Sequence, residues 1–266
     1  MSCSNFIPEL WQCNLDRHMN DIRVYGHLVN RDYEGKIKSF GDRVHITLPP
    51  DVLDDVRPEL LIDHCRYFNF MVMDIDSAQK NPKIIDNATK RIACSITSNV
   101  EEYLADTFVK ACAQSNMLYD IDHAPVPTSD NAYDYLVDLS IVLSKNDVPM
   151  LGRWVILPPW YYLLLTKDER FVSNGNGLNQ ALSHNGAIGK AAGFAVYVSN
   201  NVPCYECKFY SILAGSSNVA AFATETVELY ATQQNHGLTN IIKGLHVYGA
   251  KVLRPESLAM LTVAKN

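Results

Sequence analysis

The sequence has no run of apolar residues near the ~20 that a helix needs to span a bilayer, so we expect no membrane partner. The opening stretch MSCSNFIPELWQCNL lacks the basic region and apolar core of a signal peptide, which favours synthesis inside the cell. Positive charge is also scarce, because 23 Lys and Arg stand against 29 Asp and Glu, a formal net charge of −6. This balance argues against a dedicated nucleic-acid-binding protein, which usually carries a strongly basic face.

Paired cysteines are nearly absent. The chain has seven cysteines, and Cys204 and Cys207 form the only close pair, in CYEC. A closed structural zinc site needs four ligands, and neither His184 nor His236 stands at ligand spacing from this pair. We therefore expect reduced thiols in and beside a strand rather than a metal site.

Catalytic and cofactor motifs are also missing. The stretch HNGAIGKAAGFAVYVSNN contains Gly186, Gly189 and Gly193, but it lacks the first glycine and the final Ser or Thr of a phosphate loop, and it precedes a strand. GNGLNQ has Gln180 where a dinucleotide fingerprint needs its third glycine. We expect no cofactor, metal or catalytic residue, and we interpret these three glycines as structural, allowing turns and close packing before FAVYV. A soluble enzyme with a site assembled from distant residues stays open as an alternative.

Apolar periodicity predicts an α+β fold in which helices alternate with strands. The clearest predicted helix covers about 98–119, where Ser98 and Glu101 form a capping-box pattern. Other predicted helices are NFIPELWQCNLDRHMNDIR with Pro8 in its first turn, a short piece around PPDVLDDVRPELLID, DNAYDYLVDLSIVLSKNDVP capped by Ser129 or Asp130, PWYYLLLTKDERF, and SNVAAFATETVELY as a small-residue helix or turn. Predicted strands are CRYFNFMVMDIDSAQ, GRWVILPP, FAVYVSNN, CKFYSILAG and LHVYGAKVLRP.

A long charged hairpin is predicted in LVNRDYEGKIKSFGDRVHITLPP, with SFGD as its turn. A lone two-stranded hairpin is marginally stable in water, so this one should lie on its own body or on a neighbouring molecule. An edge hairpin of an ordinary sheet is an equally good interpretation of these residues. Its candidate contact residues are Arg31, Asp32, Glu34, Lys36, Lys38, Asp42 and Arg43.

Four segments together resemble the major capsid (coat) proteins of tailed bacteriophages. They are LVNRDYEGKIKSFGDRVHI, GRWVILPPWYYLLLTKDERF, NGAIGKAAGFAVYVSNNVP and GLHVYGAKVLRPESLAML. Each is weak alone, but the four run in the family's order and the resemblance extends over roughly residues 6–261.

This resemblance implies the Hong Kong 97-type fold. The implied parts are an N-terminal arm (1–28), an extended loop (29–50), a peripheral domain (51–121) with a spine helix at about 98–119, an axial domain (122–240), and a return to the peripheral domain (241–266). The seven charged hairpin residues would then contact an adjacent subunit.

The implied function is that of a structural shell protein, not an enzyme. It would self-assemble into hexamers and pentamers around double-stranded DNA, which it would contact non-specifically. Further implied partners are a separate scaffolding protein, a portal at one vertex and a decoration protein, with assembly in the host cytoplasm and final location in the virion. An encapsulin-like compartment of the same fold is the alternative.

Overall fold

The computed structural model describes residues 6–32, 40–46, 59–73, 82–173, 188–217, 219–233 and 239–265. The chain divides into two compact units, and each is built from several stretches of sequence. Unit 1 comprises Met1–Arg23, Arg31–Val100 and Phe222–Ala250, and unit 2 comprises Val24–Asn30, Glu101–Ala221 and Lys251–Asn266.

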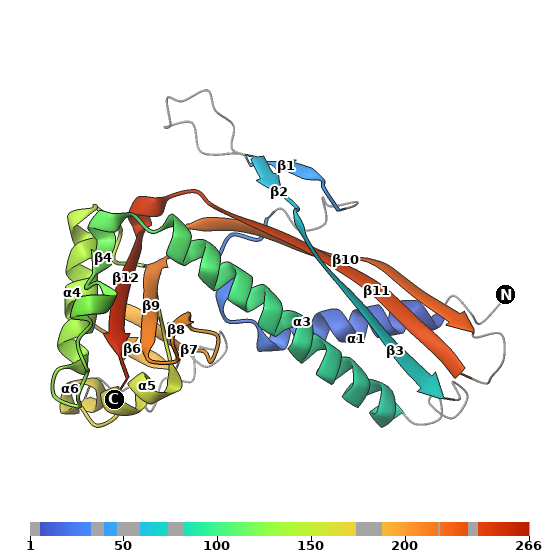
Figure 1. The fold of residues 1–266 in the computed structure, drawn as a ribbon, viewed down its shortest axis with the longest axis horizontal. Coiled ribbons are helices and arrows are strands. Elements are labelled where there is room, and N and C mark those ends of the chain that lie inside the picture. Colours follow the sequence, from blue (N-terminus) through green and yellow to red (C-terminus); the bar gives the residue numbers. More distant parts are fainter. Residues whose placement is uncertain are drawn as a thin grey trace. The chain divides into compact units, whose positions relative to one another are not determined.

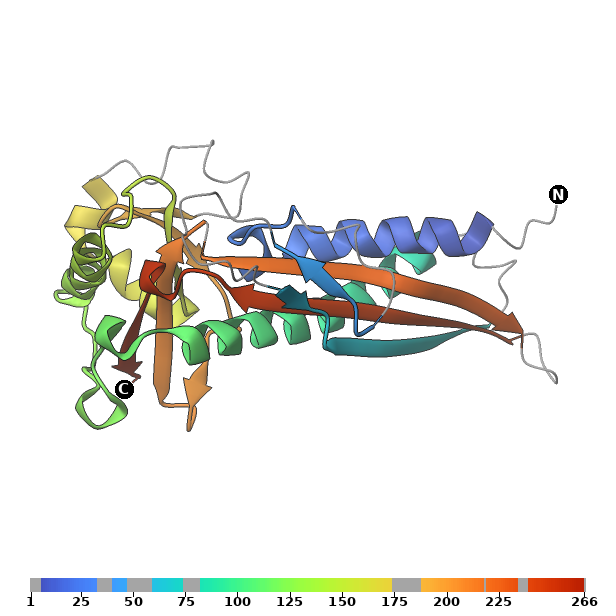
Figure 2. The same cartoon turned by 90° about the horizontal axis from the view of Figure 1, so that it is seen from above.

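Unit 1 is organised around a three-stranded sheet in the order β10-β11-β3. In β11 and β3 the antiparallel register runs from the pair Thr239 and Met73 to the pair Tyr248 and His64. Helix α1 and the first part of α3 run along one side of this sheet (Figure 1), and Figure 2 shows the three strands face-on with α1 beside β10. The bounds are α1 Phe6–Ile22, β3 His64–Met73, α3 Pro82–Ala111, β10 Ala220–Gln233 and β11 Thr239–Val252.

A second, two-stranded sheet in unit 1 pairs β1 (Arg43–His45) with β2 (Glu59–Leu61). The predicted hairpin paired residues 33–38 with 43–48 instead. Residues 33–39 and 47–58 lie outside the described residues. Because Arg43–His45 pairs with Glu59–Leu61, the hairpin extends beyond its predicted end at residue 50. The predicted helical piece at 49–63 is wrong at its end, because Glu59–Leu61 is a strand.

Unit 2 contains a mixed seven-stranded sheet in the order β4-β12-β9-β5-β7-β6, with β8 paired to β9. β5 is buried along its whole length, because it lies between β9 and β7 and both of its faces are covered. The strands are β4 Met117–Leu118, β5 Arg153–Leu157, β6 Gly189–Ala191, β7 Phe194–Val198, β8 Cys204–Tyr205, β9 Phe209–Ser216 and β12 Leu258–Ala264. The helices are η2 Tyr25–His27, η3 Gln114–Asn116, η4 Ile121–His123, α4 Ala132–Lys145, α5 Pro159–Leu165, α6 Glu169–Ser173 and η5 Pro255–Ser257.

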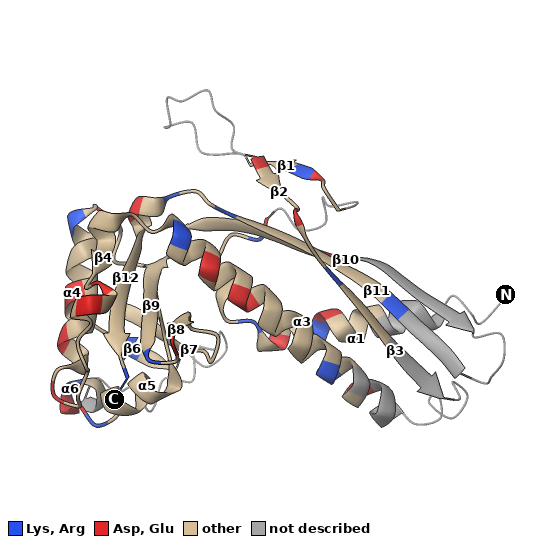
Figure 3. Cartoon of the chain, in the orientation of Figure 1, with Lys and Arg blue, Asp and Glu red and all other residues tan. Residues whose placement is uncertain are grey.

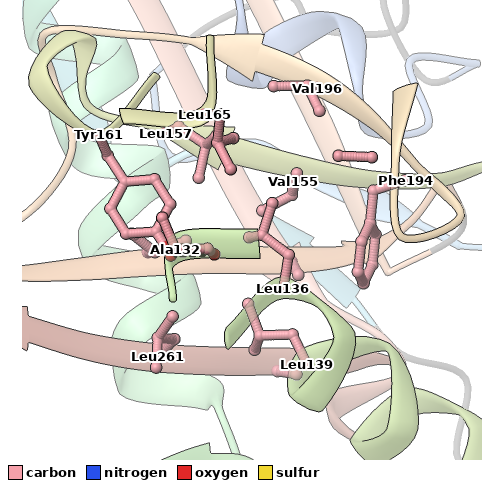
Figure 4. Packing of buried hydrophobic residues seen from close by; sticks show 14 of the residues in the cluster. Ala132, Leu136, Leu139, Val155, Leu157, Tyr161, Leu165, Phe194, Val196 and Leu261 are labelled. Carbon is pink, nitrogen blue, oxygen red and sulfur yellow. Dashed lines mark hydrogen bonds between the residues drawn. The ribbon is translucent and has the colours of Figure 1, made fainter. Parts of the chain in front are cut away.

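The core of unit 2 forms where α4 and α5 cover one face of this sheet (Figure 4). Leu136 and Leu139 of α4 face Val155 of β5, and all three side chains are fully buried. The Tyr161 hydroxyl in the same cluster donates to the Ala132 carbonyl oxygen at 2.8 Å, which satisfies its polar group inside the core. On the other face of β5, Trp154 stacks near Phe108 of α3 with ring centroids 6.0 Å apart.

Helix α3 begins 16 residues before the predicted start at Ser98, and it ends at Ala111 rather than near residue 119. The capping-box interpretation of Ser98 and Glu101 is therefore wrong, since both lie inside the helix. The buried stripe continues upstream of Val100 through Ala93 and Ile96 at helical spacing, and Pro82 is suited to the first turn.

The stretch SNVAAFATETVELY is also corrected, because most of it belongs to strand β10 and not to a helix. Its small residues predicted a helix from local propensity, but Ala220, Ala221 and Ala223 are fully buried, and tertiary packing overrides that propensity. The predicted caps Ser129 and Asp130 of α4 are wrong, because Asn131 holds the N-cap position. Its side chain does not cap the helix amides, since its Oδ1 accepts from the preceding Thr128 amide at 2.7 Å.

The predicted domain boundaries differ from the two compact units. Residues 222–240 fall in unit 1 and not with the rest of the predicted axial domain, while residues 101–121 and 251–266 fall in unit 2. The physical reason is strand pairing: β10 pairs with β11, whereas β12 pairs with β9.

Several predicted elements are confirmed. Helices were predicted at α1, α4 and α5, and strands at β3, β5, β7, β9 and β11. Among the described helices, none combines the length and the apolar character that crossing a bilayer requires.

Candidate functional site

The predicted contact residues of the extended loop are separated in the structure. Glu34, Lys36 and Lys38 lie outside the described residues, and Asp32 is exposed. Arg43 of β1 pairs with Glu59 of β2, with Nη1 and Oε2 3.2 Å apart. Such an exposed pair contributes only about 0–1 kcal/mol.

Backbone hydrogen bonds fix the base of this hairpin. The Gly41 amide donates to the Ile62 carbonyl oxygen at 2.9 Å, and the Ile62 amide donates to the Asp42 carbonyl oxygen at 3.0 Å. Gly41 has a φ of +88°, a conformation that glycine adopts without strain. The Asp42 backbone thus closes the hairpin.

Arg31 lies away from this hairpin base and lines a polar cavity of about 260 Å³ within unit 1. The cavity is bordered by α1, β10 and β11. Its lining residues are Gln12, Asp16, Asn20, Arg23, Arg31, Thr224, Glu225, Thr226 and His246. Two guanidinium groups converge on one amide oxygen here, since Arg31 Nη2 and Arg23 Nη1 donate to Asn20 Oδ1 at 3.1 and 3.3 Å.

His246 of β11 is the most buried ionisable group of the cavity. Its Nε2 lies 2.8 Å from Thr224 Oγ1 and its Nδ1 lies 3.1 Å from Thr226 Oγ1, so both ring nitrogens have hydroxyl partners on β10. Thr226 Oγ1 in turn donates to Asp16 Oδ1 of α1 at 3.3 Å. Burial, and secondarily the nearby Arg23 charge, lower the pKa of His246 to about 3.

The hydrogen bonds of the cavity link α1 to strands β10 and β11. His246 is neutral at ordinary pH with both nitrogens engaged, which leaves it poorly suited to act as a general base. The charges that line the cavity are mixed, with Asp16 and Glu225 beside the two arginines. The result is a hydrogen-bonded polar seam between α1 and the sheet of unit 1.

Two of the three predicted glycines, Gly189 and Gly193, lie in one hairpin of unit 2. Gly189 is in β6, which pairs antiparallel with β7, and Gly186 lies outside the described residues. Ala192 and Gly193 form the turn between these strands with φ values of +48° and +87°. Two positive φ angles are the requirement of a type I′ hairpin turn.

Glu101 of α3 is a buried carboxylate whose role the sequence did not reveal. Its Oε1 accepts from the Val24 and Gly26 amides at 3.1 and 3.2 Å, and its Oε2 accepts from the Tyr25 amide at 2.9 Å. Three successive amides around one carboxylate form charge-assisted hydrogen bonds, which are stronger than neutral ones. The only sequence signal was an acidic residue on an otherwise apolar helix face.

The two cysteines of CYEC lie at the surface of unit 2. Cys204 and Cys207 are exposed free thiols, Cys204 in β8 and Cys207 in the turn before β9. Within the described ranges, no three His, Cys, Asp or Glu side chains gather in a way that could hold a metal ion.

Comparison with known families identifies the chain over most of its length. The profile of the phage capsid protein family matches residues 72–261. A search of curated protein sequences gave no significant match.

Solved structures with the same fold come from phages and from a virus-like particle. A structure from Mycobacterium phage Che8 is 24% identical with a TM-score of 0.64, and the match covers 90% of each chain. The capsid structure of cyanophage P-SCSP1u is 14% identical with a TM-score of 0.62, covering 92% of this chain and 89% of that one. A virus-like particle from Pyrococcus furiosus is 16% identical with a TM-score of 0.59, covering 95% and 98%. These similarities confirm the predicted α+β fold of the Hong Kong 97 type.

Proposed function

The chain belongs to the phage capsid protein family, and from that premise we propose that it assembles into hexamers and pentamers of an icosahedral shell. Its role is that of a major capsid protein, a structural component of a phage particle. The observation that carries this role is the family match over residues 72–261. The shell encloses the double-stranded DNA genome of a tailed phage.

The two compact units have separate parts in this proposal. Unit 2, with its seven-stranded sheet, supplies most of the axial domain, and unit 1, with its three-stranded sheet and the first part of α3, supplies most of the peripheral domain. Residues 1–28 serve as the N-terminal arm. The hairpin that begins near residue 29 and includes β1 and β2 serves as the extended loop.

The extended loop contacts the adjacent subunit through alternating charges. Its described members Asp32, Asp42 and Arg43 include both signs, as do the remaining members Glu34, Lys36 and Lys38, whereas Arg31 donates to Asn20 of its own chain. Exposed charge pairs are individually weak, so they set register and still allow errors to be corrected during assembly. Contacts of this head-to-tail kind close into rings.

Further partners complete the particle. We propose a separate scaffolding protein for assembly in the host cytoplasm, a portal at one vertex, and a decoration protein on the outer surface. The packaged DNA contacts the wall non-specifically.

An encapsulin-like compartment is the second candidate. It is supported by the similarity to the holo-SrpI encapsulin complex from Synechococcus elongatus, which is 14% identical with a TM-score of 0.53 and covers 86% of this chain and 84% of that one. The two candidates differ in content, because a phage head encloses genomic DNA after packaging through a portal, whereas a compartment encloses cargo protein.

Electron microscopy and sedimentation of the expressed protein test the proposal. Expression with candidate scaffolding proteins from the same genome should give closed shells of uniform diameter. A subunit that stays monomeric at high concentration, both alone and with those proteins, would contradict shell assembly. Purified particles that hold protein cargo and no portal would favour the compartment.

A further inference from the structure

Two large apolar side chains project together from one tight turn of unit 2. Met150 and Leu151 lie between α4 and β5, and they are 69% and 93% exposed. Single exposed apolar residues are common on protein surfaces, but here two consecutive ones occupy the end of a turn. We call these two residues the apolar tip.

A buried arginine holds the backbone below the apolar tip. The Arg153 guanidinium donates from Nε to the Pro149 carbonyl oxygen at 3.1 Å, and from Nη2 to the Val148 carbonyl oxygen. Its Nη1 reaches α4, donating to the Ser140 carbonyl oxygen at 3.1 Å and to Ser144 Oγ at 3.1 Å. Burial lowers the pKa of Arg153, and a buried guanidinium is tolerated only where such bonds satisfy it.

The turn is fixed from its other side as well. Asn146 Nδ2 donates to Asn116 Oδ1 at 2.9 Å and to the Glu256 carbonyl oxygen at 3.0 Å. Gly152 has a φ of +81°, which lets the chain turn sharply into β5. The backbone that carries the apolar tip is thus held by hydrogen bonds from two sides, and such preorganisation lowers the entropic cost of docking.

Three further exposed apolar side chains belong to the stretch of unit 2 that follows β4. Tyr119, Ile121 and Val126 are between 42% and 45% exposed. The Tyr119 ring meets the Tyr135 ring edge-on, with centroids 6.0 Å apart, so α4 supports it. We call these three residues the receiving surface.

The charges beside the two surfaces are complementary. Exposed Lys145 ends α4 just before the tip, and Lys190 belongs to the β6–β7 hairpin, whose turn lies beside Met150. Asp147 within the turn and exposed Glu256, whose carbonyl oxygen accepts from Asn146, offset part of this positive charge. Asp120 and Asp122 flank the residues of the receiving surface in sequence, and both are exposed.

We propose that the apolar tip of one copy of this chain docks on the receiving surface of a second copy. The contact is head-to-tail, because it places Lys145 and Lys190 opposite Asp120 and Asp122, whereas tip-to-tip pairing would oppose lysines. Contacts between two different surfaces of one chain close into rings when the rotation allows. This inference rests on the proposed shell function and names a contact that would hold its rings together.

The first test replaces the tip with Met150→Ser and Leu151→Ser together. We expect the free subunit to melt at the wild-type temperature, because both side chains are exposed. The protein concentration needed for assembly, measured by sedimentation, should rise at least about tenfold, since apolar burial at every contact is lost. The matched control is Leu163→Ser, a leucine of α5 that is 60% exposed.

Two outcomes would overturn the inference. One is assembly of the double variant at the wild-type concentration. The other is an equal loss in Leu163→Ser, which would mean that exposed apolar surface in general drives assembly. Failure of the wild-type chain to form any shell would instead contradict the proposed function itself.

The second test exchanges charge between the two surfaces. Lys145→Glu should weaken assembly, and adding Asp122→Lys should restore it toward wild type, because the opposite charges face each other again. Absence of rescue, with both variants melting normally, would show that the receiving surface is not the partner of the tip.

Discussion

Glu101 shows how one buried carboxylate can shape the chain around it. Its side chain is buried, and it accepts hydrogen bonds from the amides of Val24, Tyr25 and Gly26. The same segment continues to Asn30, whose amide donates to the Ala220 carbonyl oxygen at 3.0 Å. Specific polar contacts, and not apolar packing alone, therefore hold residues 24–30 against the rest of unit 2.

The substitution Glu101→Gln should destabilise the subunit by about 2–3 kcal/mol, because hydrogen bonds to a charged acceptor are replaced by weaker ones. Urea unfolding monitored by circular dichroism measures this loss. Glu102→Gln on the exposed neighbouring position of α3 is the control, and it should change stability by less than about 0.5 kcal/mol. Equal effects of the two variants would contradict the role assigned to Glu101.

His246 gives the subunit a specific pH dependence. Its pKa is about 3 in the folded state, against about 6.5 in an unfolded chain. Below about pH 6.5 the unfolded state binds a proton that the folded state refuses, so stability falls as pH falls toward 3, by up to about 1.4 kcal/mol per pH unit. The groups around this ring are Asp16, Arg23, Arg31 and Glu225.

Replacing the imidazole tests that dependence. The variant His246→Gln should have a shallower loss of Tm between pH 6 and pH 4 than the wild type, although it is less stable at pH 7. His123→Gln, on an exposed histidine of η4, should keep the wild-type slope. If His246→Gln follows the wild-type slope as well, the buried ring is not the group that titrates.

At the scale of elements, local patterns predicted most helices and strands but not their limits. Ser98 and Glu101 match a capping box, yet α3 starts at Pro82, because the buried stripe continues through Ala93 and Ile96. β10 was missed since alanine favours helices locally, and only its burial within a sheet selects a strand.

The polar cavity could not be predicted from sequence for a related reason. Asp16, Arg31, Thr226 and His246 come from four distant stretches, and only the pairing of β10 with β11 and the docking of α1 bring them together. The family resemblance, in contrast, depends on the order of short segments such as GRWVILPPWYYLLLTKDERF. The order of these segments can be read from the sequence alone, whereas contacts between distant residues cannot.

Gly249 controls how closely the base of the hairpin approaches the three-stranded sheet. A Cβ atom on Gly249 of β11 would collide with the backbone carbonyl oxygen of Leu61 in β2. Gly249→Ala should therefore destabilise unit 1 by about 1–3 kcal/mol, as overpacking usually does. Thermal melting measures it. Gly244→Ala is the control: the three atoms nearest to its added Cβ belong to the Phe68 ring, and a side chain yields at lower cost than the backbone, so a smaller loss is expected.

The charges of the extended loop should matter for assembly more than for folding. Reversing Lys36 and Asp42 together, to Glu and Lys, removes the proposed contacts to the adjacent subunit. We expect shell yield to fall while the subunit Tm changes little, since exposed pairs contribute about 0–1 kcal/mol to folding. Collapse of the Tm would show instead that the hairpin belongs to the core of its own subunit.

At the scale of the whole molecule, acidic and basic positions are interspersed along the described elements (Figure 3), and the full chain carries a net charge of −6. Interspersed charges of both signs are compatible with repeated weak contacts between copies. Such a charge distribution is poorly suited to holding nucleic acid, whose phosphates require a concentrated positive field. A wall of this kind would enclose DNA without fixing it in place, as packaging and ejection require.

The salt dependence of DNA binding tests this last property. Free subunits should bind double-stranded DNA weakly, with a logarithmic slope against salt concentration of magnitude below about 3, because each phosphate contact adds about 0.9. Fluorescence anisotropy of a labelled duplex across a salt series measures the slope. A DNA-binding protein with a basic face, titrated in parallel, should give a much steeper slope and so verify the range of the assay. A steep slope for the capsid subunit would mean that basic side chains form a phosphate-binding surface despite the acidic balance of the chain. The shell would then bind its packaged DNA tightly.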